Sequence, residues 1–190
     1  NIKVSWDAGS VTENGFYAVY PTDCKRTIIE DTEITGASDA GIYVGSCEHA
    51  IVRRNKVYGN VAGIEIENSR YADVYENEVY DNVGGSIVFV LPKVAIKETR
   101  FVLVRDNIIR ANNHANFATS GTVVSYVPFG LGMLVLAGSD IEIRDNVIED
   151  NQGTGIMTVS FRTFELLTDR PLDDPEMDPF LRRLYIDLTG

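Results

Sequence analysis

Short runs of alternating apolar and polar residues recur at a nearly fixed interval along the chain. The clearest is Gly63–Asn68, GIEIEN, which follows a similar run at Gly41 and precedes another at Gly85. These three glycines are evenly spaced along the chain. Alternation places successive side chains on opposite faces of a strand, and a fixed period of this length is typical of a stacked β-solenoid.

The unit Ala62–Val83 serves as the template for each coil, with a Gly-led strand, a polar turn, and then Val-x-x-Asn-x-Val-x-x-x-Asn. Its apolar side chains are expected to face the interior, because a charge buried there would be unpaired. The predicted inward pairs are Phe16/Ala18, Ile42/Val44, Ile64/Ile66, Ser86/Val88 and Met133/Val135, then Ile29/Ile34, Val52/Val57, Val74/Val79, Val104/Ile109 and Ile143/Ile148. Two columns of stacked amides are predicted to form hydrogen-bonded ladders, namely Asn55, Asn77, Asn107 and Asn146, and Asn60, Asn82, Asn112 and Asn151.

Departures from the period predict loop insertions. The interval from Gly15 to Gly41 is slightly longer than the period, and the interval from Gly85 to Gly132 is more than twice as long. The glycine and asparagine spacings together assign about eight extra residues to 91–98 and about seventeen to 112–129, while a turn-rich acidic loop occupies 162–183. All three insertions border the Gly-led strands, and the long loops of a solenoid usually carry its function.

The repeats therefore predict an all-β fold, a parallel β-helix of roughly six to seven coils that forms a single domain over 1–190. Strand-like segments, IKVSW and LYIDLTG, lie at the two ends of the sequence. Open solenoid ends expose unpaired strand edges, so this arrangement favours a fragment of a longer solenoid.

Charge narrows the possible partners. The formal net charge is −11, with 17 basic against 28 acidic residues, which argues against nucleic acid or an anionic membrane as a partner. No apolar run reaches the ~18 residues of a membrane span. The excess of acidic residues allows a cationic partner, although an acidic surface more often serves only to keep a protein soluble.

The outward positions of the Gly-led strands are the candidate site. Tyr17, Tyr43, Glu65 and Glu67 place aromatic rings beside carboxylates, a combination that suits a glycan or a basic peptide. The alternative is that these tyrosines simply pack against each other. Further along, the outward residues are apolar, Ile87, Phe89, Leu134 and Leu136, and we expect the 112–129 insertion to fold over them. The alternative for this strip is a docking site for a partner protein.

Two other functions remain open. The first is a polysaccharide lyase or epimerase that uses Glu65 and Glu67, whose side chains lie about 6.6 Å apart by strand rise. Acidic polymers also need positive groups, and these would come from loops, as Lys93, Lys97, Arg100 or His114. The second is a purely structural surface protein without a ligand.

Metal chemistry has a weak basis in this sequence. His49 and His114 are isolated, so a transition-metal site is disfavoured. The acidic cluster Asp169, Asp173, Asp174, Glu176 and Asp178 allows a calcium site or a solvated loop. There is no C-x-x-C-H motif for haem attachment.

The two cysteines fall at equivalent positions of adjacent coils. Cys24 lies five residues before Ile29, and Cys47 lies five before Val52. Their Cα atoms should be about 5 Å apart, which permits a disulfide. The alternative is two free thiols packed in a turn. A Cys24–Cys47 bridge would indicate an extracytoplasmic protein.

The repeats resemble right-handed parallel β-helix repeat proteins, a class that includes pectate lyases, alginate epimerases and NosD-type proteins. The segments NGFYAVYP, GASDAGIYVG, NVAGIEIENS, GGSIVFVLP and GLGMLVLA look more narrowly like a bacterial family of secreted or lipoprotein β-helix-repeat proteins. This resemblance implies a right-handed helix and a periplasmic, outer-membrane or secreted location. It also implies an exported partner of cytochrome-like character, and it transfers no catalytic residue. The Asp-Pro-His-Glu signature of the epimerases is absent, and Asp174-Pro175-Glu176 lacks its histidine.

Overall fold

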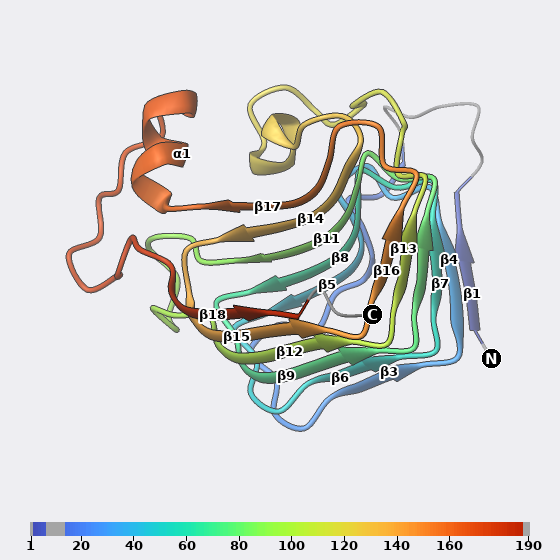
Figure 1. Cartoon of the computed structure of the whole chain (residues 1–190), viewed down its shortest axis with the longest axis horizontal. Coiled ribbons are helices and arrows are strands. Elements are labelled where there is room, and N and C mark those ends of the chain that lie inside the picture. Colours follow the sequence, from blue (N-terminus) through green and yellow to red (C-terminus); the bar gives the residue numbers. More distant parts are fainter. Residues whose placement is uncertain (1, 7–13, 188–190) are drawn as a thin grey trace.

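The computed structural model describes residues 2–6 and 14–187, which form a solenoid of three parallel sheets (Figure 1). Each sheet has six strands, and we name it by its first strand. The β1 sheet holds β1 (Ile2–Ser5), β4 (Thr32–Thr35), β7 (Lys56–Tyr58), β10 (Glu78–Tyr80), β13 (Ile108–Arg110) and β16 (Val147–Glu149). The β2 sheet holds β2 (Tyr17–Val19), β5 (Ala40–Gly45), β8 (Ala62–Glu67), β11 (Gly84–Phe89), β14 (Leu131–Leu136) and β17 (Thr154–Val159). The β3 sheet holds β3 (Ile28–Glu30), β6 (Ile51–Arg53), β9 (Arg70–Tyr75), β12 (Arg100–Arg105), β15 (Ser139–Arg144) and β18 (Arg182–Ile186).

The core runs along the inside of the three sheets, as the alternation predicted. Ile42, Ile64 and Met133 are fully buried within it. Parallel pairing keeps equivalent residues in line, so that Ile64 pairs with Ile42 on one side and with Ser86 on the other. β-branched side chains dominate these columns, because they pack well on a pleated sheet that is covered on its inner face.

The first coil differs from its prediction. Phe16 and Ala18 were expected to face inward, but Phe16 is 54% exposed. Val19 pairs with Ile42 and takes the inward position, so these two coils are offset by close to the standard period and not by the longer interval from Gly15 to Gly41. Ala18 therefore stands where later coils have glycine, and the extra residues precede β2 instead of lying within the coil.

Both predicted asparagine ladders are present. The side-chain nitrogen of Asn77 donates to the Oδ1 of Asn107 at 2.9 Å, and Asn55 donates in the same way to Asn77. Asn60, Asn82, Asn112 and Asn151 repeat this arrangement at the next corner. The tight left-handed turn falls on the residue before each amide, such as Glu76 with φ 55°. The amides therefore satisfy buried backbone groups at these corners.

Glycine opens the strands of the β2 sheet because another coil passes close by. A Cβ atom placed on Gly63 would lie 2.5 Å from the carbonyl oxygen of Gly85 and 2.5 Å from Cγ1 of Val79. No side chain fits at that distance without a shift of its neighbours. Glycine is therefore required at this position of the repeat for steric reasons. The position lies where the asparagine ladder meets the apolar core.

The insertions lie where the spacings predicted them. Glu67 pairs with Phe89, whereas Arg70 pairs with Arg100, so the offset between these coils grows by eight across the 91–98 insertion. The 112–129 insertion contains a short 3₁₀ helix, η1 (Val123–Tyr126). The 162–183 stretch was expected to be a loop, but it includes most of a helix, α1 (Phe161–Thr168), capped by the Ser160 side chain. No helix within the described residues is long and apolar enough to cross a membrane.

Two of the insertions are tied together at one end of the β2 sheet. Asp174 is 6% exposed, and its carboxylate accepts hydrogen bonds from the backbone nitrogen of Lys93 and from Nζ of Lys97, each at 2.7 Å. These contacts fix the chain that follows α1 against the 91–98 insertion. The β2 sheet is consequently the face that all three insertions surround (Figure 1).

Candidate functional site

The outer face of the β2 sheet carries Glu65 and Glu67, as predicted, but neither lies open to solvent. Glu65 is 2% exposed and Glu67 is 7% exposed. Residues 122–124 of the 112–129 insertion lie over this part of the sheet and help to line a cavity there. The predicted polar face is therefore a partly covered acidic cavity.

The acidic cavity has a volume of about 290 Å³. Its lining residues are Phe16, Tyr17, Asp39, Glu65, Glu67, Phe89, Leu91, Thr122, Val123 and Val124. Asp39 precedes β5 and is 8% exposed, and it accepts a hydrogen bond from the Tyr17 hydroxyl at 3.3 Å. None of the described residues that line the cavity is basic. Asp39 was not among the predicted site residues, although its place directly before strand β5 was a usable indication.

Burial raises the pKa of all three carboxyl groups. The pKa of Asp39 rises to about 6 and that of Glu67 to about 7, while hydrogen bonds from Tyr17 and Tyr43 work in the opposite direction. The pKa of Glu65 is raised well above its ordinary range, first by burial and then by the negative charges of Asp39 and Glu67. Near neutral pH the cavity can therefore both donate and accept hydrogen bonds.

The tyrosines form one stacked group at the edge of this cavity. Because Val19 pairs with Ile42, the residue level with Tyr43 is Tyr20 and not Tyr17 as expected. The rings of Tyr20 and Tyr43 stack with centroids 4.6 Å apart, and Tyr17 stacks on Tyr20 at the same distance. Tyr43 is 8% exposed, so it supports the group, whereas Tyr17 lines the cavity.

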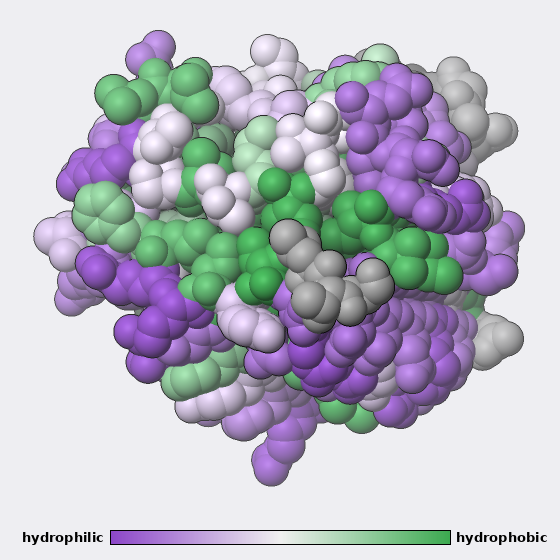
Figure 2. All heavy atoms as spheres, in the orientation of Figure 1, coloured by the Kyte–Doolittle hydropathy of each residue, from purple (hydrophilic) through white to green (hydrophobic). Residues whose placement is uncertain are grey.

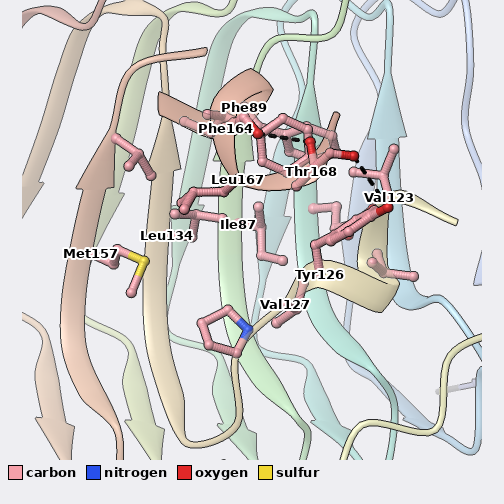
Figure 3. Close-up of a pocket in the computed structure, with 15 residues that line it drawn as sticks. Ile87, Phe89, Val123, Tyr126, Val127, Leu134, Met157, Phe164, Leu167 and Thr168 are labelled. Carbon is pink, nitrogen blue, oxygen red and sulfur yellow. Dashed lines mark hydrogen bonds between the residues drawn. The ribbon is translucent and has the colours of Figure 1, made fainter. Parts of the chain in front are cut away.

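An apolar groove adjoins the acidic cavity. It has a volume of about 310 Å³ and lies over β11, β14 and β17, between η1 and α1 (Figure 3). Its lining residues are Glu65, Ile87, Phe89, Val123, Val124, Tyr126, Val127, Pro128, Leu134, Leu136, Met157, Val159, Phe164, Leu167 and Thr168. The 112–129 insertion does fold over the apolar strip, since Val124 and Val127 pack with Ile87 and Phe89, but it leaves this space unfilled.

Apolar residues also gather outside the groove. A band of them crosses the middle of the face shown in Figure 2, from the region of β17 towards that of β16, between hydrophilic regions. A further group lies over α1, where Leu166 and Leu167 are 83% and 75% exposed. Leu167 lines the groove and Leu166 does not.

Glu65 belongs to both spaces. It lines the acidic cavity and the apolar groove, and its Oε1 atom is buried with no hydrogen-bond partner among the described residues. Oδ1 of Asp39 is likewise buried and unpartnered within the described part of the chain. A buried polar atom without a partner costs about 1–3 kcal/mol, so both atoms mark positions where a bound group would gain hydrogen bonds.

The positive groups considered for a lyase or epimerase lie elsewhere. Lys93 pairs with Asp173, Lys97 with Asp174 and Arg100 with Asp140. The imidazole of His114 lies 3.5 Å from Asp81. These groups are therefore engaged by carboxylates of the chain and do not face Glu65 and Glu67.

Contacts also engage several of the remaining candidates for metal binding. Asp173, Asp174 and Asp178 pair with Lys93, Lys97 and Arg182, which neutralises much of the acidic 162–183 insertion. His49 stacks on Tyr71 with ring centroids 4.7 Å apart. Across the described residues, no group of three His, Cys, Asp or Glu side chains is placed to hold a metal ion.

Cys24 and Cys47 occupy adjacent coils, as the repeat predicted. The neighbouring residues Lys25 and Glu48 pair with each other, and this pairing has the same offset that separates the two cysteines. Both are free thiols in this structure, so the predicted bond is not formed in it. Cys47 is buried, and burial raises the pKa of its thiol.

Three parallel sheets, each taking one strand from every coil, define a parallel β-helix solenoid. A family model described as the right-handed beta helix region matches residues 9–167, and the chain belongs to this family. The match establishes the fold and its handedness, and it points to no ligand or activity. Searches of curated proteins and of solved structures gave no match.

Proposed function

We propose that this chain is an exported β-helix binding module that holds a glycan in the acidic cavity of the β2 sheet. The observation that carries the proposal is the grouping of Asp39, Glu65 and Glu67 in one buried cavity with no basic residue in its described lining. Sugar hydroxyl groups donate hydrogen bonds, and the unpartnered oxygens of Asp39 and Glu65 would accept them. Export is supported by the family resemblance of the repeats.

The cavity also selects the kind of glycan. Phe16 and Tyr17 line it and offer apolar ring surface to the flat face of a sugar. A uronate would bring a further negative charge beside three carboxyl groups with no cation to neutralise it, which is costly at a buried position. The ligand we propose is therefore a neutral oligosaccharide and not an acidic polymer.

Affinity measurements test this proposal. Neutral and uronate-containing oligosaccharides of equal length should be titrated into the protein and into Asp39→Asn and Glu67→Gln variants, with Glu149→Gln as a control on an exposed strand of the β1 sheet. We expect neutral ligands to bind at least tenfold more tightly than uronates, and both cavity variants to lose at least tenfold while the control keeps full affinity. Equal affinity in all four proteins, or preference for uronates, would refute the proposal.

An enzyme is the alternative that a specific observation favours. The pKa values of about 6 for Asp39 and about 7 for Glu67 suit a general acid or base near neutral pH. For a lyase or epimerase, however, the candidate cations Lys93, Lys97 and Arg100 are paired with other carboxylates and do not line the cavity. Turnover of a polysaccharide that Glu67→Gln abolishes, without loss of binding, would favour this alternative. A purely structural role predicts neither binding nor turnover.

A further inference from the structure

We propose that the apolar groove is a separate binding site for a primary alkylamine or arylalkylamine, with the hydrocarbon part in the groove and the ammonium group on Glu65. This site goes beyond glycan binding, because its ligand class and most of its contacts are different. The two sites share the Glu65 side chain alone among charged residues.

The floor of the groove is a single row of outward side chains. Glu65 pairs with Ile87, Ile87 with Leu134, and Leu134 with Met157. Successive strands of a sheet lie about 4.8 Å apart, so the row extends about 14 Å from the carboxyl group to the thioether. Figure 3 shows Ile87 and Leu134 beneath the groove and Met157 at its side. The arrangement provides a long apolar surface with one acidic end.

Side walls enclose this row. η1 and the residues after it contribute Val123, Tyr126 and Val127, and α1 contributes Phe164 and Leu167 from the opposite side (Figure 3). A volume of about 310 Å³ falls at the lower end of the range of ligand pockets, roughly 300–1,000 Å³. The size suits one hydrocarbon chain or a small aromatic group and excludes a folded protein surface.

The charge at the acidic end is one-sided. Glu65 interacts with Asp39 before β5, with Tyr17 from β2 and with Glu67 from its own strand, and it lies in register with Tyr43 of β5. The described lining of the groove adds one titratable group, Tyr126, and no basic residue. Arg170 lies over the ring of Tyr126, with its guanidinium carbon 5.5 Å from the ring centroid, and does not line the groove. A cationic ligand group would therefore complement the acidic end of the groove at Glu65.

Proton balance gives the proposal a distinctive signature. Burial and the acidic neighbours of Glu65 raise the pKa of its carboxyl well above the ordinary range and so favour its protonated form in the empty groove. An alkylamine is already an ammonium ion at neutral pH. When it binds, Glu65 becomes a carboxylate beside the ammonium group and its proton passes to the solvent. One proton is thus released for each amine bound, and none for an alcohol of the same chain length.

Calorimetry with octylamine, 1-octanol and octanoate tests the proposal. Each compound is titrated at pH 7 in phosphate and in HEPES, whose different ionisation enthalpies report the protons released. We expect octylamine to bind at least tenfold more tightly than 1-octanol and to release about one proton, and octanoate not to bind. Affinity should rise roughly fourfold per methylene from hexylamine to octylamine. Equal binding of the three compounds, or amine binding without proton release, would overturn the proposal.

Three variants separate this site from the glycan site. Glu65→Gln should lower octylamine affinity at least tenfold, abolish proton release and leave 1-octanol binding unchanged. Leu134→Trp fills the groove and should remove binding of both compounds while glycan binding is retained. Leu166→Trp makes the same kind of change at an exposed position outside the groove and should change neither. Retention of octylamine affinity by Leu134→Trp would place the amine elsewhere and refute the site.

Discussion

Glu65 in β8 lies in register with Ile87 in β11, and Glu65 lines both the acidic cavity and the apolar groove whereas Ile87 lines the groove alone. One strand spacing thus separates a buried carboxyl group from a hydrocarbon floor. The outward side chains of a solenoid can change from charged to apolar between one coil and the next. Each coil contributes one residue to a column, and only the inward residues of neighbouring coils must pack together to form the core.

The stability of the protein should depend on pH through Glu67. Its folded-state pKa is raised to about 7 by burial, so its contribution is fully favourable below about pH 4 and is lost as pH rises through 7. Glu67→Gln removes this loss. We expect the variant to be more stable than the parent at pH 8, by up to about 3 kcal/mol, and the difference to vanish near pH 4. Urea unfolding at a series of pH values measures it.

Glu30 provides a control of opposite sign. Its pKa is lowered, chiefly by the hydrogen bond from Arg53, so its contribution is present above its ordinary pKa and is lost as pH falls. Glu30→Gln should therefore reduce stability at pH 7 and have little effect near pH 3. A pH profile for Glu67→Gln that parallels the profile of the parent would show that Glu67 is solvated.

Gly63→Ala should destabilise the coil formed by Ala62–Val83, the template unit of the repeat. The new Cβ would lie 2.5 Å from the carbonyl oxygen of Gly85, so neighbouring backbone must move. We expect a loss of about 1–3 kcal/mol, which is typical of overpacking. Gly155→Ala is the matched control, because its Cβ would meet its nearest neighbour, Cγ2 of Ile148, at 3.8 Å. Thermal unfolding of both variants gives the comparison, and equal melting temperatures would contradict this steric explanation of the regularly spaced glycines.

Much of the fold could be predicted because the solenoid repeats its local rules. The even spacing of Gly41, Gly63 and Gly85 located the coils, and the pairings of Phe89 and Arg100 match the predicted insertion at 91–98. The error at Phe16 arose where Gly15 imitates the glycine that opens other coils. A single residue type cannot establish the register of so short a strand as β2 when the flanking spacing also changes.

Less of the candidate site could be predicted, because it depends on contacts between distant insertions. Glu65 and Glu67 were placed correctly on the outer face, but their burial follows from the path of residues 122–124. Asp39 was missed since it precedes its strand and lies outside the alternating pattern. The helix α1 had a local indication, Ser160 followed by apolar Phe161 and Phe164, which the acidic residues after it obscured.

Asn77→Ala should be among the most destabilising substitutions at the corner that leads into the β1 sheet. The Asn77 side chain accepts hydrogen bonds from the backbone and side-chain nitrogens of Asn55 and donates to Asn107 and to the carbonyl of Val52. Its loss leaves several buried groups without partners, at about 1–3 kcal/mol for each. We expect a total loss of at least about 3 kcal/mol in urea unfolding.

Asn146→Ala is the control for the ladder. Asn146 accepts the same two hydrogen bonds, from the backbone and side-chain nitrogens of Asn107, but its own side chain donates to backbone carbonyls and not to another ladder asparagine. It is also only partly buried, so water can replace part of its contacts. Its substitution should cost clearly less than that of Asn77. If the two variants were equally stable, the buried position within the ladder would have no energetic importance.

The cysteine pair should respond to oxidation. Each thiol now donates to a carbonyl two residues earlier, Cys24 to Thr22 and Cys47 to Gly45, and the chain register holds the two residues in adjacent coils. We predict that an oxidising environment forms the Cys24–Cys47 bond and stabilises the protein by about 3 kcal/mol, since a loop of this size is closed in the unfolded chain. Thiol titration of denatured, unreduced protein should then find none free, whereas reduced protein gives two. Cys24→Ser should abolish the oxidation-dependent rise in melting temperature, and two titratable thiols after oxidation would refute the bond.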